Sequence, residues 1–150
     1  MADTPLLIGW KEYADLPDLG IQRVKVKVDS GARTSTLHIR ACRVLEVLPD
    51  GTEQVELTLD PWRRYPERTV TVRERVLRYI QVTDSGGHRE LRPVIETELV
   101  LGPVRKRILV TLTDRSGMLF RMILGRKALE RDFHVDVSRK YLLRRKKKTP

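Results

Sequence analysis

The residues best suited to chemistry lie where a predicted strand ends. That strand runs from Arg23 to Val28, and the chain continues as Asp29-Ser30-Gly31-Ala32. A carboxylate at the end of an apolar strand needs hydrogen bonds to hold its charge. The Ser30 hydroxyl and the backbone N–H groups of a turn at Gly31 can supply them. The same four residues are also typical of an ordinary turn, so on their own they leave a structural and a functional interpretation open.

A second motif, Met122-Ile123-Leu124-Gly125-Arg126, follows much later in the chain. An apolar-apolar-Gly strand after an earlier Asp-Ser/Thr-Gly-Ala resembles the retropepsin-type aspartic proteases. The resemblance implies that Asp29 is the catalytic carboxylate. It further implies that the loop is completed and supported by Ser30, Gly31, Ala32, Ile123, Leu124, Gly125 and Arg126.

The resemblance extends over most of the chain, from about residue 8 to residue 143. It rests on Ile8-Gly9-Trp10, on Leu16 to Gly20, on Lys27 to Ser35, on Gly87 to Val94 and on Phe120 to Arg126. These motifs are similar to the bacterial retropepsin-like family labelled "ATP-dependent zinc protease" (RimB-like). Members are often encoded near ATP-grasp ligases that append amino acids such as glutamate, which implies a role in trimming such products.

The residues themselves do not support the zinc and ATP of that label. The sequence has no His-Glu-x-x-His motif, and His38, His88 and His134 are widely spaced. His38 and Cys42 would share one face of a strand, without an obvious third ligand. A Gly-rich phosphate loop of the Walker type is also missing from the sequence. We therefore expect no metal and no cofactor.

The number of catalytic motifs determines the mechanism that we expect. Aspartic proteolysis needs two carboxylates about 3 Å apart that share one proton, and this chain has one Asp-Ser-Gly-Ala. Asp84-Ser85-Gly86-Gly87 lacks both the preceding apolar strand and the alanine, and we interpret it as the tip of a flap-like hairpin. We therefore expect a homodimer that brings two Asp29 side chains together across a two-fold axis.

The residues of the predicted flap and cleft are predicted to bind a peptide substrate, because several of them are arginines and arginine binds carboxylates through paired hydrogen bonds. As separate residues, each charged member also fits a solvated surface position. The predicted flap and cleft residues are Arg33, Gly86, Gly87, His88, Arg89, Glu90 and Arg92.

The hydrophobic pattern predicts a mainly β fold, because apolar residues alternate with polar ones over most of the chain. With the resemblance, this indicates a retropepsin-like closed β-barrel. A short helix is predicted over Arg126 to Arg131, and residues 1–138 are predicted to form the domain. Residues 139–150 are predicted to hold a closing strand and a basic tail. The predicted strands cover 23–28, 37–41, 55–59, 69–72, 76–82, 91–101, 108–113, 118–124 and 133–137, with a bend or a bulge at 73–75.

Composition bounds the possible partners. The chain has 150 residues, 40% of them hydrophobic, and a net charge of +10. Seven of its cations lie in residues 139–150, so nucleic-acid binding is only weakly supported, through this tail. No apolar run is long enough to span a membrane, and the N-terminus predicts a cytoplasmic protein. Two functions stay open: an aspartic endopeptidase, or a non-catalytic β-domain that binds anionic polypeptides or nucleic acid through its arginines and tail.

Overall fold

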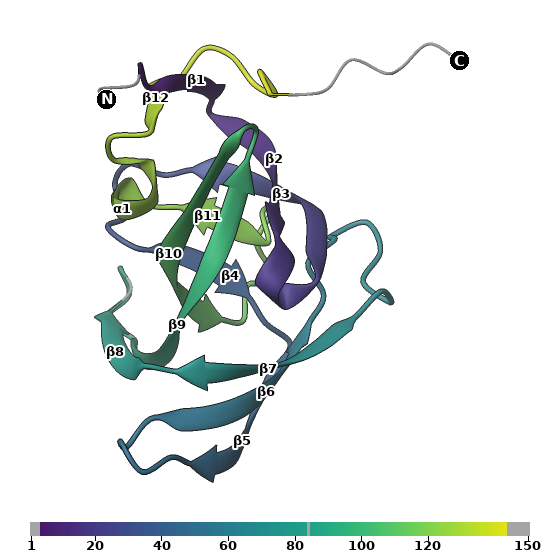
Figure 1. Ribbon diagram of the computed structural model, residues 1–150, viewed down its shortest axis with the longest axis vertical. Coiled ribbons are helices and arrows are strands. Elements are labelled where there is room, and N and C mark those ends of the chain that lie inside the picture. Colours follow the sequence, from purple (N-terminus) through teal and green to yellow (C-terminus); the bar gives the residue numbers. More distant parts are fainter. Residues whose placement is uncertain (1–3, 84, 144–150) are drawn as a thin grey trace.

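The computed structural model describes residues 4–83 and 85–143, and six of its strands close into a barrel (Figure 1). These strands are β2 (Lys11–Leu16), β3 (Ile21–Val28), β4 (Ser35–His38), β9 (Arg89–Leu101), β10 (Val104–Thr113) and β11 (Met122–Leu124). They are hydrogen-bonded in the order β10-β4-β11-β3-β2-β9, and the antiparallel pairing of β9 with β10 closes the ring. Closure leaves none of the six strands with an unpaired edge.

Two smaller sheets extend the barrel at opposite ends (Figure 1). One is an antiparallel sheet of β5 (Ala41–Val47), β6 (Glu53–Leu59) and β7 (Val70–Val76). The other is the parallel pair of β1 (Leu6–Gly9) and β12 (Phe133–Asp136). β8 (Arg78–Thr83) pairs with β9 as a hairpin. The 3-10 turn η1 (Pro17–Leu19) and the single-turn helix α1 (Arg126–Leu129) complete the fold.

The core follows from the alternation in the sequence. In β3, Val24 and Val26 are fully buried, whereas Lys25 between them and Lys27 after them face solvent. A strand with this period places every second side chain on one side of the sheet. The prediction of a mainly β closed barrel with one short helix is confirmed.

Several predicted boundaries are wrong. No bend interrupts β7, because its pairing with β6 is continuous from Val70 to Val76. The strand predicted over 118–124 begins only at Met122, after a turn in which the Met118 N–H donates to the Arg115 carbonyl. The helix ends at Leu129 rather than at Arg131, and β1 and β2 were not predicted.

The C-terminal segment differs from the prediction over its described part. The strand that closes the fold is β12, and residues 139–143 contain no strand. They lie instead against β2, where the Tyr141 N–H donates to the Lys11 carbonyl at 2.9 Å. The buried Glu12 carboxylate accepts the N–H groups of Leu142 at 2.9 Å and Leu143 at 3.2 Å. The rest of the predicted tail, 144–150, lies outside the described residues.

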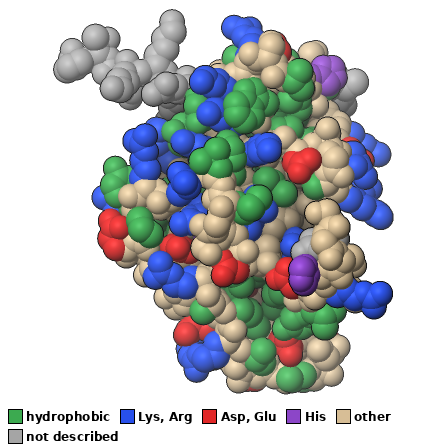
Figure 2. Space-filling view, turned by 180° about the vertical axis from the view of Figure 1, so that it is seen from behind, with side chains coloured by type: hydrophobic (Ala, Val, Ile, Leu, Met, Phe, Trp, Pro, Cys, Tyr) green, Lys and Arg blue, Asp and Glu red, His purple; other side chains and the backbone are tan. Residues whose placement is uncertain are grey.

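Charges of both signs cover the surface. Figure 2 shows Lys and Arg side chains spread over the face opposite to that of Figure 1, with Asp and Glu among them. Several form ion pairs, such as Arg105 with Glu98 at 2.7 Å and Arg43 with Glu56 at 3.1 Å. Exposed pairs of this kind contribute little to stability. Among the described residues, no helix has the length and apolar character needed to cross a membrane.

Candidate active site

Asp29 begins the loop that follows β3, and backbone hydrogen bonds define its position. Its N–H donates to the Leu124 carbonyl at 2.9 Å, and its own carbonyl accepts the Ala32 N–H at 3.1 Å. The Gly31 N–H donates to Asp29 Oδ1 at 3.1 Å. The side chain remains partly exposed. The loop thus holds a carboxylate in a fixed orientation while keeping it accessible to a ligand.

The strand β11 lies directly beside this loop, because it runs parallel to β3 with Leu124 opposite Val28. The next residue, Gly125, packs so tightly that a Cβ atom there would lie 2.7 Å from the Thr34 carbonyl carbon. Its N–H donates to Ser35 Oγ at 3.1 Å. The second motif therefore forms one wall of the Asp29 loop, and only glycine fits at its end.

Arg126 fixes the Asp29 loop through hydrogen bonds to its backbone carbonyls. Its N–H donates to the Ala32 carbonyl at 2.8 Å, and its guanidinium Nη1 donates to the carbonyls of Ser30 at 3.0 Å and Gly31 at 3.3 Å. Three successive carbonyls of the loop are thereby engaged by one residue. Arg126 braces the loop through its backbone and leaves the Asp29 carboxylate to other partners.

The β8–β9 hairpin carries the residues predicted for the flap. Gly86, Gly87, His88 and Arg89 are exposed at or beside its tip, where Gly87 has a φ of +84° that glycine favours. Asp84 lies outside the described residues. The contact of these four residues with a substrate stays a prediction.

Glu90 and Arg92 lie further along β9 and contact each other. Arg92 Nε donates to Glu90 Oε2 at 3.2 Å, and the hydroxyl of Thr113 on β10 donates to Glu90 Oε1 at 2.5 Å. Glu90 thus offsets part of the Arg92 charge. The Arg92 side chain is largely shielded from solvent, with a relative exposure of 21%, so a ligand reaching it would meet a partly desolvated cation.

Arg115 is a site residue that the sequence did not reveal. It follows β10 in Asp114-Arg115-Ser116-Gly117, which has the composition of a simple turn. Burial lowers the pKa of its guanidinium, and the nearby charge of Arg92 lowers it further, whereas the Asp29 carboxylate acts in the opposite direction. Arg115 therefore lies within electrostatic range of both Asp29 and Arg92.

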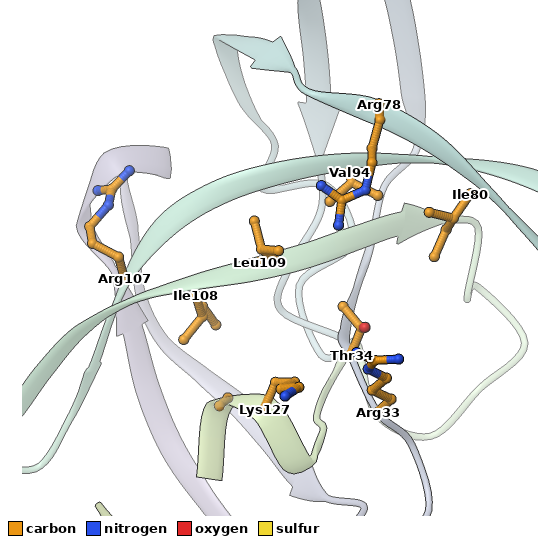
Figure 3. Close-up of a pocket in the computed structure, with 10 residues that line it drawn as sticks. Arg33, Thr34, Arg78, Ile80, Val94, Arg107, Ile108, Leu109 and Lys127 are labelled. Carbon is orange, nitrogen blue, oxygen red and sulfur yellow. The ribbon is translucent and has the colours of Figure 1, made fainter. Parts of the chain in front are cut away.

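A pocket of about 500 Å³ opens next to the residues that follow the Asp29 loop (Figure 3). Arg33 and Thr34, which follow the loop, line it together with Lys127 of α1, and Arg78 reaches toward them from β8. Apolar side chains line it from β8, β9, β10 and α1, namely Ile80, Val94, Ile108, Leu109 and Ala128, and Arg107 of β10 adds a further cation. Arg33 was predicted for the cleft, whereas Arg78 and Lys127 were not, because only strand pairing brings them to it.

The chain matches the family model described as "Retropepsin-like aspartic endopeptidase RimB" over residues 7–146. It belongs to the RimB-like family. The prediction of this family is confirmed, and with it the retropepsin-like assignment of the β-barrel.

The relatives of this RimB-like chain carry a different name. Two proteins named "Probable alpha-L-glutamate ligase" are similar to it. One, from Shewanella pealeana, is 33% identical, and the match covers 95% of this chain and 31% of the relative's own length. The other, from Desulfotalea psychrophila, is 37% identical, and the match covers 82% of this chain and 26% of the relative's own length. The chain thus spans less than a third of these relatives. A crystal structure of a Legionella pneumophila protein of unknown function has the same fold, with a TM-score of 0.74 and 22% identity, covering 93% of this chain and 99% of that one.

The RimB-like chain offers no cluster of metal ligands among residues 4–83 and 85–143. His38, one half of the pair considered in the sequence, has both ring nitrogens engaged. Its Nε2 lies 2.6 Å from Asp60 Oδ1, and its Nδ1 accepts the Arg115 N–H at 2.7 Å. Burial raises the pKa of the Cys42 thiol, which disfavours the thiolate form that binds zinc.

Proposed function

We propose that this protein is an aspartic endopeptidase whose active site forms when two copies bring their Asp29 side chains together. The observation that carries the proposal is the Asp29 loop in a RimB-like chain, fixed by β11, Gly125 and Arg126 while its carboxylate stays accessible. One chain supplies one such loop. The reaction needs two carboxylates, so a two-fold symmetric dimer is the simplest arrangement that provides the second.

In the proposed mechanism, a water molecule lies between the two Asp29 carboxyl groups, which share one proton. The ionised carboxylate takes a proton from the water as its oxygen attacks the peptide carbonyl carbon, and the protonated one gives its proton to the carbonyl oxygen. The gem-diol then collapses: the carboxyl group that took the proton of the water gives it to the leaving nitrogen, the other carboxylate takes a proton from a gem-diol hydroxyl, and the C–N bond breaks. Because one group must be ionised and the other protonated, the rate should be bell-shaped in pH.

Acidic peptides are the proposed substrates. Arg33, Arg78 and Lys127 line the pocket next to the Asp29 loop, and Arg115 lies within electrostatic range of Asp29 and Arg92. Guanidinium groups bind carboxylates through paired, charge-assisted hydrogen bonds. The relatives named as glutamate ligases are consistent with substrates that carry added glutamate residues.

The test compares two matched substitutions, Asp29→Asn and Asp50→Asn. Asp50 lies in the exposed turn between β5 and β6, far along the chain from the motifs. Asp29→Asn should lower cleavage of a glutamate-rich peptide by at least about a thousandfold, while Asp50→Asn should cleave like wild type. The fold should survive, because the amide oxygen introduced by Asp29→Asn can still accept the Gly31 N–H. Full activity in Asp29→Asn would refute the mechanism.

A mixing experiment tests the dimer separately. If each active site uses both Asp29 side chains, a mixed dimer of wild type and Asp29→Asn is inactive. With about a tenfold excess of the variant, the activity per wild-type chain should fall about tenfold after subunit exchange. Unchanged activity would mean that one chain is sufficient.

The second candidate function is a non-catalytic module that binds acidic chains, favoured by the same cation-lined pocket. In that case, wild type and Asp29→Asn would bind a glutamate-rich peptide equally and neither would cleave it. Binding that depends on 139–150 and prefers nucleic acid would instead point to the basic tail.

A further inference from the structure

A buried polar cluster next to the active site has no part in the mechanism above. His38 at the end of β4 is 2% exposed, Asp60 directly after β6 is 3% exposed, and Arg121 just before β11 is 7% exposed. Ionisable side chains are almost never buried to this degree unless they have partners. Their partners show what the cluster holds in place.

His38 connects two parts of the molecule that are distant in sequence. One ring nitrogen, Nδ1, accepts the backbone N–H of Arg115, so the neutral ring carries its proton on Nε2, which faces Asp60 Oδ1 at 2.6 Å. The other Asp60 oxygen faces the guanidinium groups of Arg40 at 3.3 Å and Arg121 at 3.8 Å. Asp60 therefore orients the ring, and the ring holds the backbone at Arg115.

Residues 114–121, here called the Arg115 loop, are folded around this contact. Arg115 Nε donates to the Phe120 carbonyl at 3.1 Å, and Arg121 Nη1 donates to the Ser116 carbonyl at 3.4 Å. At the base of the loop, the His38 N–H donates to the Arg121 carbonyl at 2.7 Å. The same residue of β4 thus contacts both ends of the loop, through its backbone at one end and its imidazole at the other.

We propose that His38 and Asp60 are positioning residues, which hold the Arg115 loop in place so that the Arg115 guanidinium binds the substrate. The loop follows Thr113, whose hydroxyl donates to the Glu90 carboxylate that also pairs with Arg92, and it leads into β11, which lies beside the Asp29 loop. The inference rests on the proposed function, because it assigns Arg115 a contact with a peptide. Stability alone does not account for the pair, since apolar side chains of similar volume often replace a buried ion pair with equal or greater stability. The need to hold the Arg115 loop in place for substrate binding accounts for the buried pair of His38 and Asp60.

Two conservative variants separate the two contacts of the ring. In His38→Asn, the amide oxygen can take the place of Nδ1 and accept the Arg115 N–H. In His38→Gln, the longer side chain can replace Nε2 opposite Asp60 but leaves the Arg115 N–H without its acceptor. Thr36→Val is the matched control, because Thr36 is also buried on β4 but bonds to Thr111, away from the loop.

The first measurement is steady-state cleavage of a glutamate-rich peptide. We expect His38→Gln to raise KM about tenfold while kcat changes less than about twofold. His38→Asn and Thr36→Val should stay close to wild type. Equal KM values for His38→Gln and His38→Asn, or an equal rise in Thr36→Val, would overturn the inference, since a merely structural role would affect all three through stability.

The second measurement, NMR-detected exchange of the Arg115 amide, does not depend on activity. This amide should exchange at least about tenfold faster in His38→Gln than in wild type, and at a near wild-type rate in His38→Asn. Unchanged exchange in His38→Gln would overturn the inference. A wild-type protein that cleaves no peptide would refute the proposed function instead, so the two failures are distinguishable.

Discussion

Two aspartates of this molecule follow strands with the same pattern and have opposite surroundings. Asp29 comes after β3, where Val24, Val26 and Val28 alternate with charged residues, and Asp60 comes after β6, where apolar residues alternate in the same way. Asp29 is partly exposed, and its carboxylate accepts one backbone N–H. Asp60 is buried against one histidine and two arginines.

The difference shows what separates a carboxylate that is accessible to a ligand from a buried structural one. The hydrogen bonds of Asp29 are to backbone groups of its own loop and of β11, which fix its position and leave its carboxylate accessible. The partners of Asp60 are side chains from two other segments, which compensate its charge in the interior. A strand that ends in an acid therefore does not specify the role of that acid; the partners do.

The largest expected effect comes from neutralising the buried member. Asp60→Asn should lower the free energy of unfolding by about 3 kcal/mol, because it leaves the buried Arg121 guanidinium without its counter-charge. Asp29→Asn should change it by less than about 0.5 kcal/mol. Urea denaturation of both variants measures the contrast. Similar losses of unfolding free energy in the two variants would show that the two aspartates do not differ in their contribution to stability.

The sequence predicts those parts of the site whose residues lie in short, continuous motifs. Asp29, Gly31 and Gly125 were identified because the two motifs together resemble those of retropepsin-type aspartic proteases, whereas Asp-Ser-Gly-Ala alone is also typical of a turn. In the structure they follow the ends of two adjacent parallel strands, in which Leu124 lies opposite Val28. The alternation of β3 and β6 likewise predicts their buried faces.

The remaining parts depend on contacts that no local pattern encodes. Arg115 lies in a turn of ordinary composition, and its position depends on an imidazole far away in sequence. The pocket residues Arg78 and Lys127 meet only through the pairing of β8, β9 and β10 and the packing of α1. β2 was missed because its partners on both sides, β3 and β9, determine its conformation more than its own residues do.

The next effect concerns the glycines on the Asp29 side. Gly125→Ala should lower the free energy of unfolding by about 2 kcal/mol, because its Cβ would overlap backbone atoms that cannot yield. Gly31→Ala should cost less than about 1 kcal/mol, since its Cβ would lie 3.2 Å from Asp29 Oδ1, a side-chain atom that can rotate away. That rotation should still lower the rate of cleavage. Thermal unfolding together with peptide cleavage tests both, and a Gly31→Ala variant with unchanged activity would mean that the Asp29 rotamer is not critical.

The smallest effect is the pH dependence of the buried cluster. Burial lowers the pKa of His38, and the Arg121 charge adds to this, whereas Asp60 and Asp114 act in the opposite direction without prevailing. The unfolded chain therefore takes up a proton before the folded one does, so stability should fall as the pH drops below about 6.5. Above that pH, His38 is neutral in both states and contributes no pH dependence.

His38→Asn should remove this dependence, whereas His134→Asn should retain it, because His134 is exposed on β12. Unfolding in urea between about pH 8 and about pH 5.5 measures the difference between the variants. If wild type instead becomes more stable than His38→Asn as the pH falls, Asp60 holds the ring protonated. A protonated Nδ1 cannot accept the Arg115 N–H, so that outcome would also mean that the pair does not hold the Arg115 loop in the way proposed.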